Sequence, residues 1–375
     1  MKYILPFRDP DAIKDAVRQV TPLAAAVAEK LGRPAQIMEV CGGHTHTLFK
    51  YGLPELLPRA VEFVHGPGCP VCVLPRAVID QAMNIAKQEQ VIFTTFGDAM
   101  RVPGSEKNLQ AARANGADIR VLYSPQDAIT LAEQNPDRQV VFFAIGFETT
   151  MPSTALVILQ AKQLGLRNFS VLSHHITIMP TLRALLDRGD VLLDGFIGPG
   201  HVSAIIGTQA YQAIAEQYQK PLVISGFEPL DMVQSLQMLL QQLNDGRCEI
   251  ENQYQRVVKN AGNQAALKAI QQVFDVCGTN ALWRGLGEIP ESGAPIASAF
   301  ADFDAAQRFQ QSLPQQSIDN TGYCDQVMIG KLKPKACPHF GNDCRPDSPL
   351  GALMVSSEGA CAAYYRYQPM VEVSG

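Results

Sequence analysis

The sequence predicts an α/β protein built from two similar parallel-sheet lobes around a cleft, with a smaller C-terminal domain. Short runs of β-branched residues alternate with helical stretches from about residue 35 to residue 240, a pattern typical of parallel strands joined by right-handed crossovers. Beyond Gly246 the alternation weakens, and four cysteines follow between residues 324 and 361. Because the apolar runs of this last part are thin, we expect it to fold around a bound metal.

Residues 1–34 are expected to form a helix packed on the body. Asp9 is a favourable N-cap and Pro10 a favourable first helical residue. Apolar residues then recur at three- and four-residue spacing until Gly32, which marks one face of a helix. Pro22 lies inside this run and is expected to kink or divide it.

Two lobes are assigned to the region of alternating strands and helices. Lobe 1 covers residues 35–130, lobe 2 covers residues 131–245, and the C-terminal domain takes residues 246–375. The predicted strands are residues 36–40, 61–65, 91–95, 119–123, 140–145, 169–173, 193–197 and 222–225.

A weak internal duplication supports the similarity of the lobes. The motif Gly66-Pro67-Gly68 recurs as Gly198-Pro199-Gly200, and each copy is followed by a strand that ends in glycine and an acidic residue. The residue 25 positions before the motif is Cys41 in the first copy and Ser173 in the second. We therefore expect the strand ends of both lobes to face a shared cleft.

Composition limits the function classes. The chain has 375 residues, 46% of them hydrophobic and 18% charged, with a net charge of −5, so it offers no basic face for nucleic acid. Its apolar runs are of strand length and its start lacks a signal-peptide core, which predicts a cytoplasmic protein without membrane insertion.

The nine cysteines are an odd number, which excludes a fully paired extracellular framework. In the cytosol, clustered cysteines are more often catalytic or metal-bound. Cys248 and Cys277 belong to neither of the clusters described below, and we expect them to be ordinary semi-buried thiols.

Cys69-Pro70-Val71-Cys72 is expected at a strand end, opening a helix. The positive end of a helix lowers the pKa of a thiol and favours thiol exchange, and the spacing allows a disulfide between Cys69 and Cys72. The alternative is half of a structural zinc site.

Cys41 follows a predicted strand and precedes two glycines, so backbone can approach whatever its sulfur binds. Ligands gather at the carboxyl ends of parallel strands, and a lone thiolate with open positions suits a soft transition metal. The alternative is a buried cysteine without function. On the same turn, His44 is expected to orient the metal or act as a base, and His46 to pack or hydrogen-bond.

The last four cysteines follow the spacing C-x12-C-x6-C-x16-C and predict a four-thiolate site. The spacing leaves zinc and an iron–sulfur cluster equally open. Basic side chains near the ligands are expected to offset their negative charge: Lys331, Lys333, Lys335 and Arg345.

Other polar residues are secondary candidates. His174, His175 and His201 are expected at matching strand ends of lobe 2. Four carboxylates in glycine-rich turns are expected to cap helices, line the lobe interface or move protons: Asp98, Glu148, Glu228 and Glu358. The sequence contains no G-x-x-x-x-G-K-[ST], H-E-x-x-H or G-x-S-x-G, which removes the main support for NTPase, zincin and serine hydrolase functions.

The motifs of Cys41 and Cys69, together with residues 96–104, 146–152, 226–231 and 351–361, closely resemble the HypD family of NiFe-hydrogenase maturation proteins over essentially the whole chain. The resemblance implies that Cys41 holds an iron carrying cyanide and carbon monoxide. It implies a 4Fe-4S cluster on four cysteines: Cys324, Cys337, Cys344 and Cys361. It also implies that Cys69 and Cys72 form a redox pair passing electrons between the cluster and the iron.

The same resemblance implies a scaffold that works with other proteins. A small HypC-type chaperone would share the Fe(II), a HypE-type donor would supply cyanide, and the finished Fe(CN)2CO unit would pass to the hydrogenase large-subunit precursor. Two other hypotheses remain open. One is a thiol-disulfide oxidoreductase with a structural metal-binding domain, for which Cys41 is dispensable, and the other is a zinc-stabilised adaptor.

Overall fold

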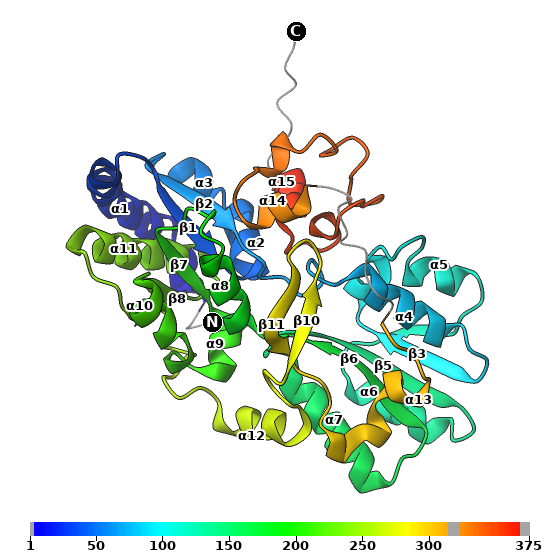
Figure 1. The fold of residues 1–375 in the computed structure, drawn as a ribbon. Coiled ribbons are helices and arrows are strands. Elements are labelled where there is room, and N and C mark those ends of the chain that lie inside the picture. Colours follow the sequence, from blue (N-terminus) through cyan, green and yellow to red (C-terminus); the bar gives the residue numbers. More distant parts are fainter. Residues whose placement is uncertain (1–3, 314–322, 368–375) are drawn as a thin grey trace.

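The computed structural model describes residues 4–313 and 323–367 (Figure 1). It contains two parallel β-sheets and one antiparallel strand pair, with helices between the strands. The predicted α/β class is therefore confirmed. Residues 314–322 and 368–375 of the predicted C-terminal domain lie outside the described residues.

The larger sheet, called sheet A, has the strand order β2-β1-β7-β8-β9. Its strands are β1 (Ala35–Glu39), β2 (Val61–His65), β7 (Gly195–Pro199), β8 (Leu222–Ser225) and β9 (Ile250–Asn252). The smaller sheet, called sheet B, has the order β4-β3-β5-β6. Its strands are β3 (Val91–Thr95), β4 (Ile119–Val121), β5 (Gln139–Gly146) and β6 (Phe169–His175). The antiparallel pair is β10 (Thr279–Trp283) with β11 (Gly287–Gly293).

The α-helices are α1 (Pro10–Leu31), α2 (Gly42–Lys50), α3 (Leu53–Leu56), α4 (Arg76–Ala86), α5 (Leu109–Ala114), α6 (Gln126–Gln134), α7 (Met151–Leu164), α8 (Ile178–Asp187), α9 (Gly200–Ile206), α10 (Gln212–Tyr218), α11 (Pro229–Asp245), α12 (Gln264–Val273), α13 (Ala305–Arg308), α14 (Cys324–Met328) and α15 (Ala360–Tyr367). Short 3-10 turns are η1 (Leu5–Arg8), η2 (Gly97–Arg101), η3 (Gln209–Tyr211), η4 (Ser298–Phe303), η5 (Pro334–Ala336) and η6 (Ala352–Met354). Within the described part of the chain, no helix combines the length and apolar character needed to cross a membrane.

Both sheets are buried on both faces, as parallel sheets usually are. In β1, Ile37 packs with α1 and α11 on the outer face of sheet A, whereas Met38 joins the central core. In β5, Phe142 packs with α7 and α12 on the outer face of sheet B, whereas Phe143 joins the same central core. The inner faces of the two sheets thus contribute to one shared core.

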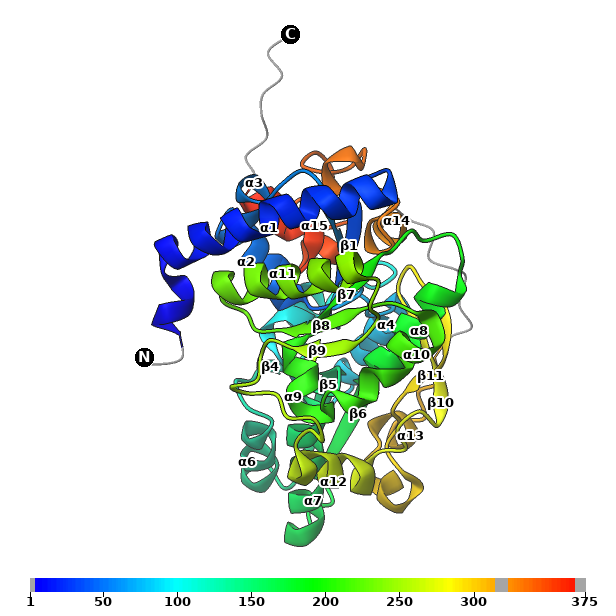
Figure 2. The ribbon, with the colours of Figure 1, turned by 90° about the vertical axis from the view of Figure 1, so that its left-hand side faces the viewer.

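The N-terminal helix forms as expected. The side chain of Asp9 accepts a hydrogen bond from the Asp11 amide, and Gly32 ends α1 with a φ of 67°. Pro22 does not divide the helix, which runs as one element across the outer face of sheet A beside α11 (Figure 2).

The sheets do not follow the predicted lobe boundaries. Along the chain, β1 and β2 of sheet A come first, the four strands of sheet B follow, and β7, β8 and β9 complete sheet A. Strands β1 and β7 are neighbours, with Ile37 paired with Gly195 and Met38 with Phe196. The first Gly-Pro-Gly motif therefore follows β2 and the second lies at the end of β7, both in sheet A, while Ser173 lies in the other sheet. Local periodicity identifies a strand but not its neighbour, because pairing depends on packing between distant segments.

The region after Gly246 does not stand apart from the sheets. Strand β9 pairs with β8, and α12 packs on α7 beside sheet B. Sequence reasoning expected few strands here and missed β9, which is a short and partly polar edge strand. The segment that carries the last four cysteines lies above α2 and the β10-β11 pair (Figure 1).

Candidate functional site

Cys41 lies at the carboxyl end of β1 and is the N-cap of α2. The expected glycine-rich turn is in fact the first turn of this helix, because Gly42 and Gly43 adopt helical backbone. Neither position has room for a side chain: a Cβ on Gly42 would meet Glu358, and one on Gly43 would meet the ring of Phe227. The two glycines thus let other chain segments close over the helix start.

The third close approach involves Gly68. A Cβ at this position would collide with the backbone of Val40 and Cys41, and the Gly68 carbonyl accepts a hydrogen bond of 3.1 Å from the Gly42 amide. The Gly-Pro-Gly motif after β2 therefore presses against the end of β1, which brings the Cys69 loop next to Cys41.

The Cys41 thiol is buried and surrounded by negative charge. Burial raises the pKa of Cys41 strongly, and the carboxylates of Glu358 and Glu39 raise it further, against a smaller lowering by the backbone of Gly43 and His44. The thiol is therefore protonated at neutral pH unless a cation binds to it. A metal ion is the usual means of forming a thiolate in such surroundings.

His44 is completely buried on α2. Its Nε2 lies 3.2 Å from the carbonyl oxygen of Ser225. Since a carbonyl only accepts, Nε2 carries the proton. Nδ1 has no hydrogen-bond partner among the described residues. Burial lowers the pKa of His44 to about 4, so the imidazole is neutral at pH 7, with Nδ1 able to accept a proton or bind a metal.

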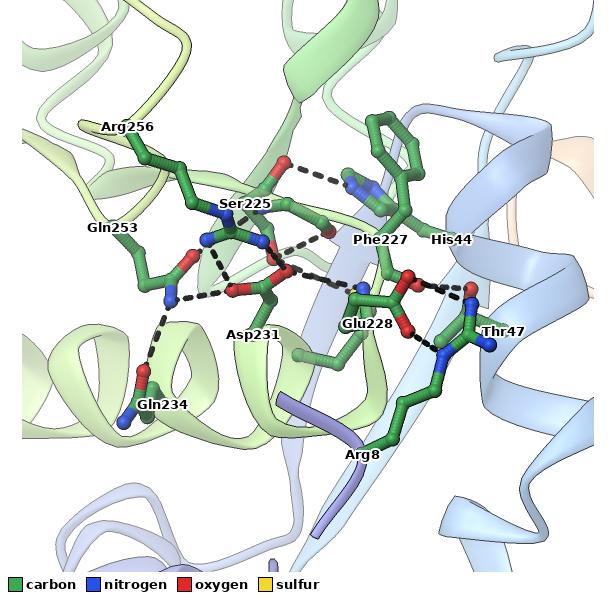
Figure 3. Close-up of polar contacts among 12 residues, drawn as sticks. Arg8, His44, Thr47, Ser225, Phe227, Glu228, Asp231, Gln234, Gln253 and Arg256 are labelled. Carbon is green, nitrogen blue, oxygen red and sulfur yellow. Dashed lines mark hydrogen bonds and ion pairs between the residues drawn. The ribbon is translucent and has the colours of Figure 1, made fainter. Parts of the chain in front are cut away.

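A network of polar residues holds the loop that packs on His44 (Figure 3). The Phe227 ring stacks between His44 and His201, at centroid distances of 4.7 and 3.7 Å. Thr47 donates a hydrogen bond of 2.7 Å to the Phe227 carbonyl. His174, His175 and His201 were all expected at strand ends of lobe 2. His201 lies at the start of α9, directly after β7 of sheet A, while the other two end β6 in sheet B.

The same loop is anchored from two distant segments. Asp231 and Glu228 form a capping box at the start of α11, Arg256 binds Asp231, and Arg8 pairs with Glu228 (Figure 3). Sequence reasoning noted Asp231 within a motif but gave no signal for Arg8 or Arg256, because their partners are more than 20 residues away.

Cys69 and Cys72 are joined by a disulfide, with their Cα atoms 5.2 Å apart. The expected helix does not begin at Cys69. It begins at Arg76, because Pro75 disfavours helical backbone at the residue before it. The sulfur of Cys69 instead accepts a hydrogen bond of 3.3 Å from the amide of Cys72.

Two small cavities lie at this end of sheet A. The first, called the disulfide cavity, is lined by Cys69, Cys72, Gly42, Thr45, His65, Gly66, Pro67, Leu353, Glu358, Gly359 and Ala360. The second, called the four-thiol cavity, is lined by Cys324, Cys337, Cys344, Cys361 and apolar residues that include Leu353. Leu353 therefore contributes to the wall of both.

The four C-terminal cysteines come together from separate turns and helices. Cys324 begins α14, Cys337 follows η5, Cys344 lies in a loop, and Cys361 is in α15. Burial raises the pKa of Cys324 to about 11, with Cys344 and Cys337 adding to it, and raises that of Cys361 well above its usual range.

This donor set fits a metal centre. Several thiolates in one apolar cavity repel one another unless cations compensate them, and metal ions do so. In the part of the chain that the structure describes, no three His, Cys, Asp or Glu side chains meet closely enough to hold a single ion. The four sulfur atoms are spread around the wall of the cavity and do not converge on a single position.

Three of the four expected basic side chains have other partners, and the structure adds Arg284. Lys331 pairs with Asp190, and Lys333 donates to the Phe63 carbonyl. Arg345 donates to the Gly341 carbonyl. Arg284, between β10 and β11, is buried, and its charge lowers the pKa of Cys324.

Arg284 also fixes the loop after the disulfide. It binds the carbonyls of Val73, Leu74 and Pro103 through its amide, Nε and Nη2, at 2.7, 2.6 and 2.6 Å. No local pattern predicts this residue, since the contacts depend on where the β10-β11 pair lies in the fold.

The remaining candidates lie in varied places. Of the four carboxylates, only Glu358 lines the disulfide cavity; Glu148 instead accepts a hydrogen bond from the Ile178 amide. Cys248 donates to the Gln219 carbonyl, and Cys277 is exposed rather than semi-buried. His46 makes an edge contact with Tyr367.

The fold and this site define a class: an α/β protein with two cysteine motifs at the carboxyl edge of one parallel sheet, covered by a C-terminal segment with four more thiols. Comparisons with known proteins identify the family. The HypD model, described as the hydrogenase formation hypA family, matches residues 15–368.

Relatives match along their full length. The hydrogenase maturation factor HypD of Rhodobacter capsulatus is 53% identical over 371 residues, which is 98% of each chain. The HypD of Escherichia coli K12 is 50% identical over 368 residues, again 98% of each chain. The hydrogenase expression/formation protein HupD of Azotobacter chroococcum is 49% identical over 385 residues and covers 100% of both chains. The chain belongs to the HypD family of hydrogenase maturation factors.

Proposed function

We propose that this protein is the scaffold on which the Fe(CN)2CO unit of NiFe-hydrogenase is assembled. The observation that carries the proposal is the closeness of three cysteine sites: Gly42, next to Cys41, lines the disulfide cavity, and Leu353 lines both that cavity and the four-thiol cavity. A scaffold of this kind needs an iron-binding thiol, a redox-active pair and a resident redox centre within short reach of one another.

Cys41 is the proposed ligand of the iron cargo. Its buried thiol keeps its proton in the absence of metal, because burial and two neighbouring carboxylates oppose the thiolate. Fe(II) would displace that proton and compensate the charge. This chain then contributes a single thiolate to the iron, which suits an iron that must leave again.

Cys324, Cys337, Cys344 and Cys361 are the proposed ligands of a 4Fe-4S cluster, which supplies one-electron redox chemistry when bound. The apolar lining that includes Val327 and Phe340 excludes water from that site. Cys69 and Cys72 are the proposed redox pair, since they already lie at bonding distance in a tight turn.

His44 is proposed to orient the iron site. Its neutral imidazole is fixed by the Ser225 carbonyl and the Phe227 ring, which leaves the lone pair of Nδ1 for the iron, its ligands or a proton. Such supporting groups tune a metal site without being its main ligand.

The proposed partners are those of the maturation pathway. A HypC-type chaperone would share the iron with Cys41, a HypE-type protein would donate cyanide, and the hydrogenase large-subunit precursor would receive the finished unit.

Infrared spectroscopy tests the proposal. The protein is purified anaerobically together with its HypC-type partner, and the spectrum is searched for cyanide and carbonyl stretching bands. Their presence on iron in the complex supports the scaffold. A complex that contains iron but never shows these bands, even when made in cells that mature hydrogenase, would contradict it.

A further inference from the structure

A buried carboxylate and imidazole lie beside the disulfide, and neither had been assigned a role. Glu39 is completely buried at the end of β1. It accepts hydrogen bonds from His65 Nδ1 at 2.8 Å, from the Cys41 amide at 3.1 Å and from the Thr45 hydroxyl. His65 ends the neighbouring strand β2, where it pairs directly with Glu39 in the sheet register. The imidazole is thus held in one orientation.

His65 shares a cavity with the disulfide. His65, Cys69 and Cys72 line the same disulfide cavity, whose volume of about 10 Å³ is close to the space of a single water molecule. Because Nδ1 donates its hydrogen to Glu39, Nε2 is the nitrogen that can exchange a proton with groups in this cavity, and it carries that proton only in the imidazolium form. A proton can cross such a gap directly or through one water.

Reduction of the disulfide requires a proton at this place. Two electrons from a reductant, such as a dithiol, break the S–S bond, and the sulfurs become one thiolate and one thiol when a single proton is supplied. The Cys72 amide already donates to the sulfur of Cys69, which favours negative charge there. Cys72 is therefore the sulfur that takes the proton.

We propose that His65, oriented by Glu39, donates a proton to the Cys69–Cys72 pair when the disulfide is reduced and takes it back when the disulfide forms again. Glu39 is a positioning residue that acts through His65. The inference rests on the proposed redox function of the pair and adds the residue that handles its proton.

The surroundings of His65 contain few other ionisable groups that could replace it. Glu39 lies on β1, Glu358 comes from the C-terminal segment, and Tyr364 on α15 packs its ring at 5.6 Å from the imidazole. On α2, Thr45 binds Glu39, and the Phe49 ring lies 5.4 Å from His65. Burial raises the pKa of Tyr364 to about 12, so its phenol is not a proton source that titrates near neutrality.

The test measures how fast the disulfide is reduced. Full-length oxidised protein is mixed anaerobically with excess dithiothreitol at several pH values between 6 and 8.5, quenched with iodoacetamide, and the labels on Cys69 and Cys72 are counted by mass spectrometry. His65→Gln should slow reduction about 100-fold at pH 6, the low end of what a positioned acid contributes. Dividing the wild-type rate by the variant rate at each pH removes the effect of dithiothreitol ionisation, which is the same for both proteins. This rate ratio should fall toward one as the pH rises.

One control variant separates packing from proton donation, and one replacement variant guards against misfolding. Phe49→Leu disturbs the contact with the His65 ring but keeps the imidazole, so its rate ratio should not vary with pH. His65→Asn repeats the test if the glutamine variant does not fold. A wild-type to His65→Gln ratio that is near one, or that is constant with pH, would overturn the role of His65. If the wild-type pair never gains two labels on reduction, the redox function itself fails, whatever the variants do.

Discussion

Arg256 binds both carboxylate oxygens of Asp231, at 2.8 and 2.5 Å, although Asp231 is completely buried. The guanidinium also stacks on the rings of Phe7 and Tyr254, at 3.9 and 4.6 Å. One ion pair thus connects the N-terminal segment, the start of α11 and the loop that carries Phe227.

Replacing Arg256 by alanine should destabilise the protein by about 3 kcal/mol, because it leaves the buried Asp231 carboxylate without its charged partner. Urea unfolding measured by circular dichroism gives the free energy of unfolding. Arg18→Ala is the matched control, since its pair with Asp15 is exposed on α1 and a surface ion pair is worth roughly 0–1 kcal/mol. Equal effects of the two variants would contradict a structural role for the buried pair.

Cys41→Ala should abolish the cyanide and carbonyl bands of the complex with the HypC-type partner while the brown colour expected from the proposed C-terminal cluster remains. The reason is that the two proposed iron sites use separate cysteines. Cys72→Ala should still bind some iron but block its ligation or reduction, and His44→Ala should give an intermediate defect. Infrared and visible spectra of the same preparations check all three. If Cys41→Ala still matures active hydrogenase, the scaffold function is wrong and thiol-disulfide exchange by Cys69 and Cys72 becomes the better account.

Cys337→Ala and Cys344→Ala should each remove the visible absorption of the cluster and destabilise the C-terminal segment, because metal binding contributes to its folding. Iron and acid-labile sulfide analysis should give about four of each per wild-type chain. Cys277→Ala, which changes an exposed thiol outside both cavities, should leave both contents unchanged. Stoichiometric zinc without sulfide would exclude the cluster and favour the zinc-stabilised adaptor.

Arg284→Ala should loosen the loop after Cys72. The change removes two side-chain hydrogen bonds, to the carbonyls of Leu74 and Pro103, and bonds from a charged group are worth roughly 1.5–3 kcal/mol each. We expect faster reduction of the Cys69–Cys72 disulfide by dithiothreitol and a lower melting temperature. Arg284→Lys should recover part of both, because an ammonium can still donate to one carbonyl. An unchanged reduction rate in Arg284→Ala would show that the hydrogen bonds of Arg284 are not needed to fix the loop after Cys72.

Glu148→Gln should stabilise the protein more at high pH than at low pH. Burial raises the pKa of Glu148 to about 7, compared with an ordinary value of 4.5, so the folded state binds the proton more tightly than the unfolded state. The favourable contribution of the Glu148 carboxyl group to the free energy of unfolding is complete below pH 4.5 and is lost as the pH rises through 7. That difference in pKa corresponds to at most about 3 kcal/mol.

The measurement is the free energy of unfolding of both proteins at pH 5 and pH 8. Glutamine keeps the acceptor for the Ile178 amide but carries no charge, so the free energy of unfolding of the variant should exceed that of the wild type by more at pH 8 than at pH 5. A gain of equal size at both pH values would mean that the carboxylate charge is not the cause.

The sequence by itself determined the local elements and the family. Runs such as Val61–His65 and Leu222–Ser225 are strands with the bounds expected, since β-branched runs between turn residues carry that information locally. Asp9 and Gly32 mark the ends of α1 for the same reason. The motifs of Cys41 and Cys69, together with residues 96–104, 146–152, 226–231 and 351–361, were sufficient to recognise the resemblance to the HypD family.

Only the tertiary structure decided which segments meet. It placed β1 beside β7, made Cys41 the N-cap of α2, and set the start of α4 at Arg76, after Pro75. It also brought Glu39 to His65 and Arg284 to the disulfide loop. These relationships join residues that are 26 and 210 positions apart, and they arise from packing of whole layers. A pattern of neighbouring residues contains no record of such contacts, because it reports the preference of each segment and not the segment against which it packs.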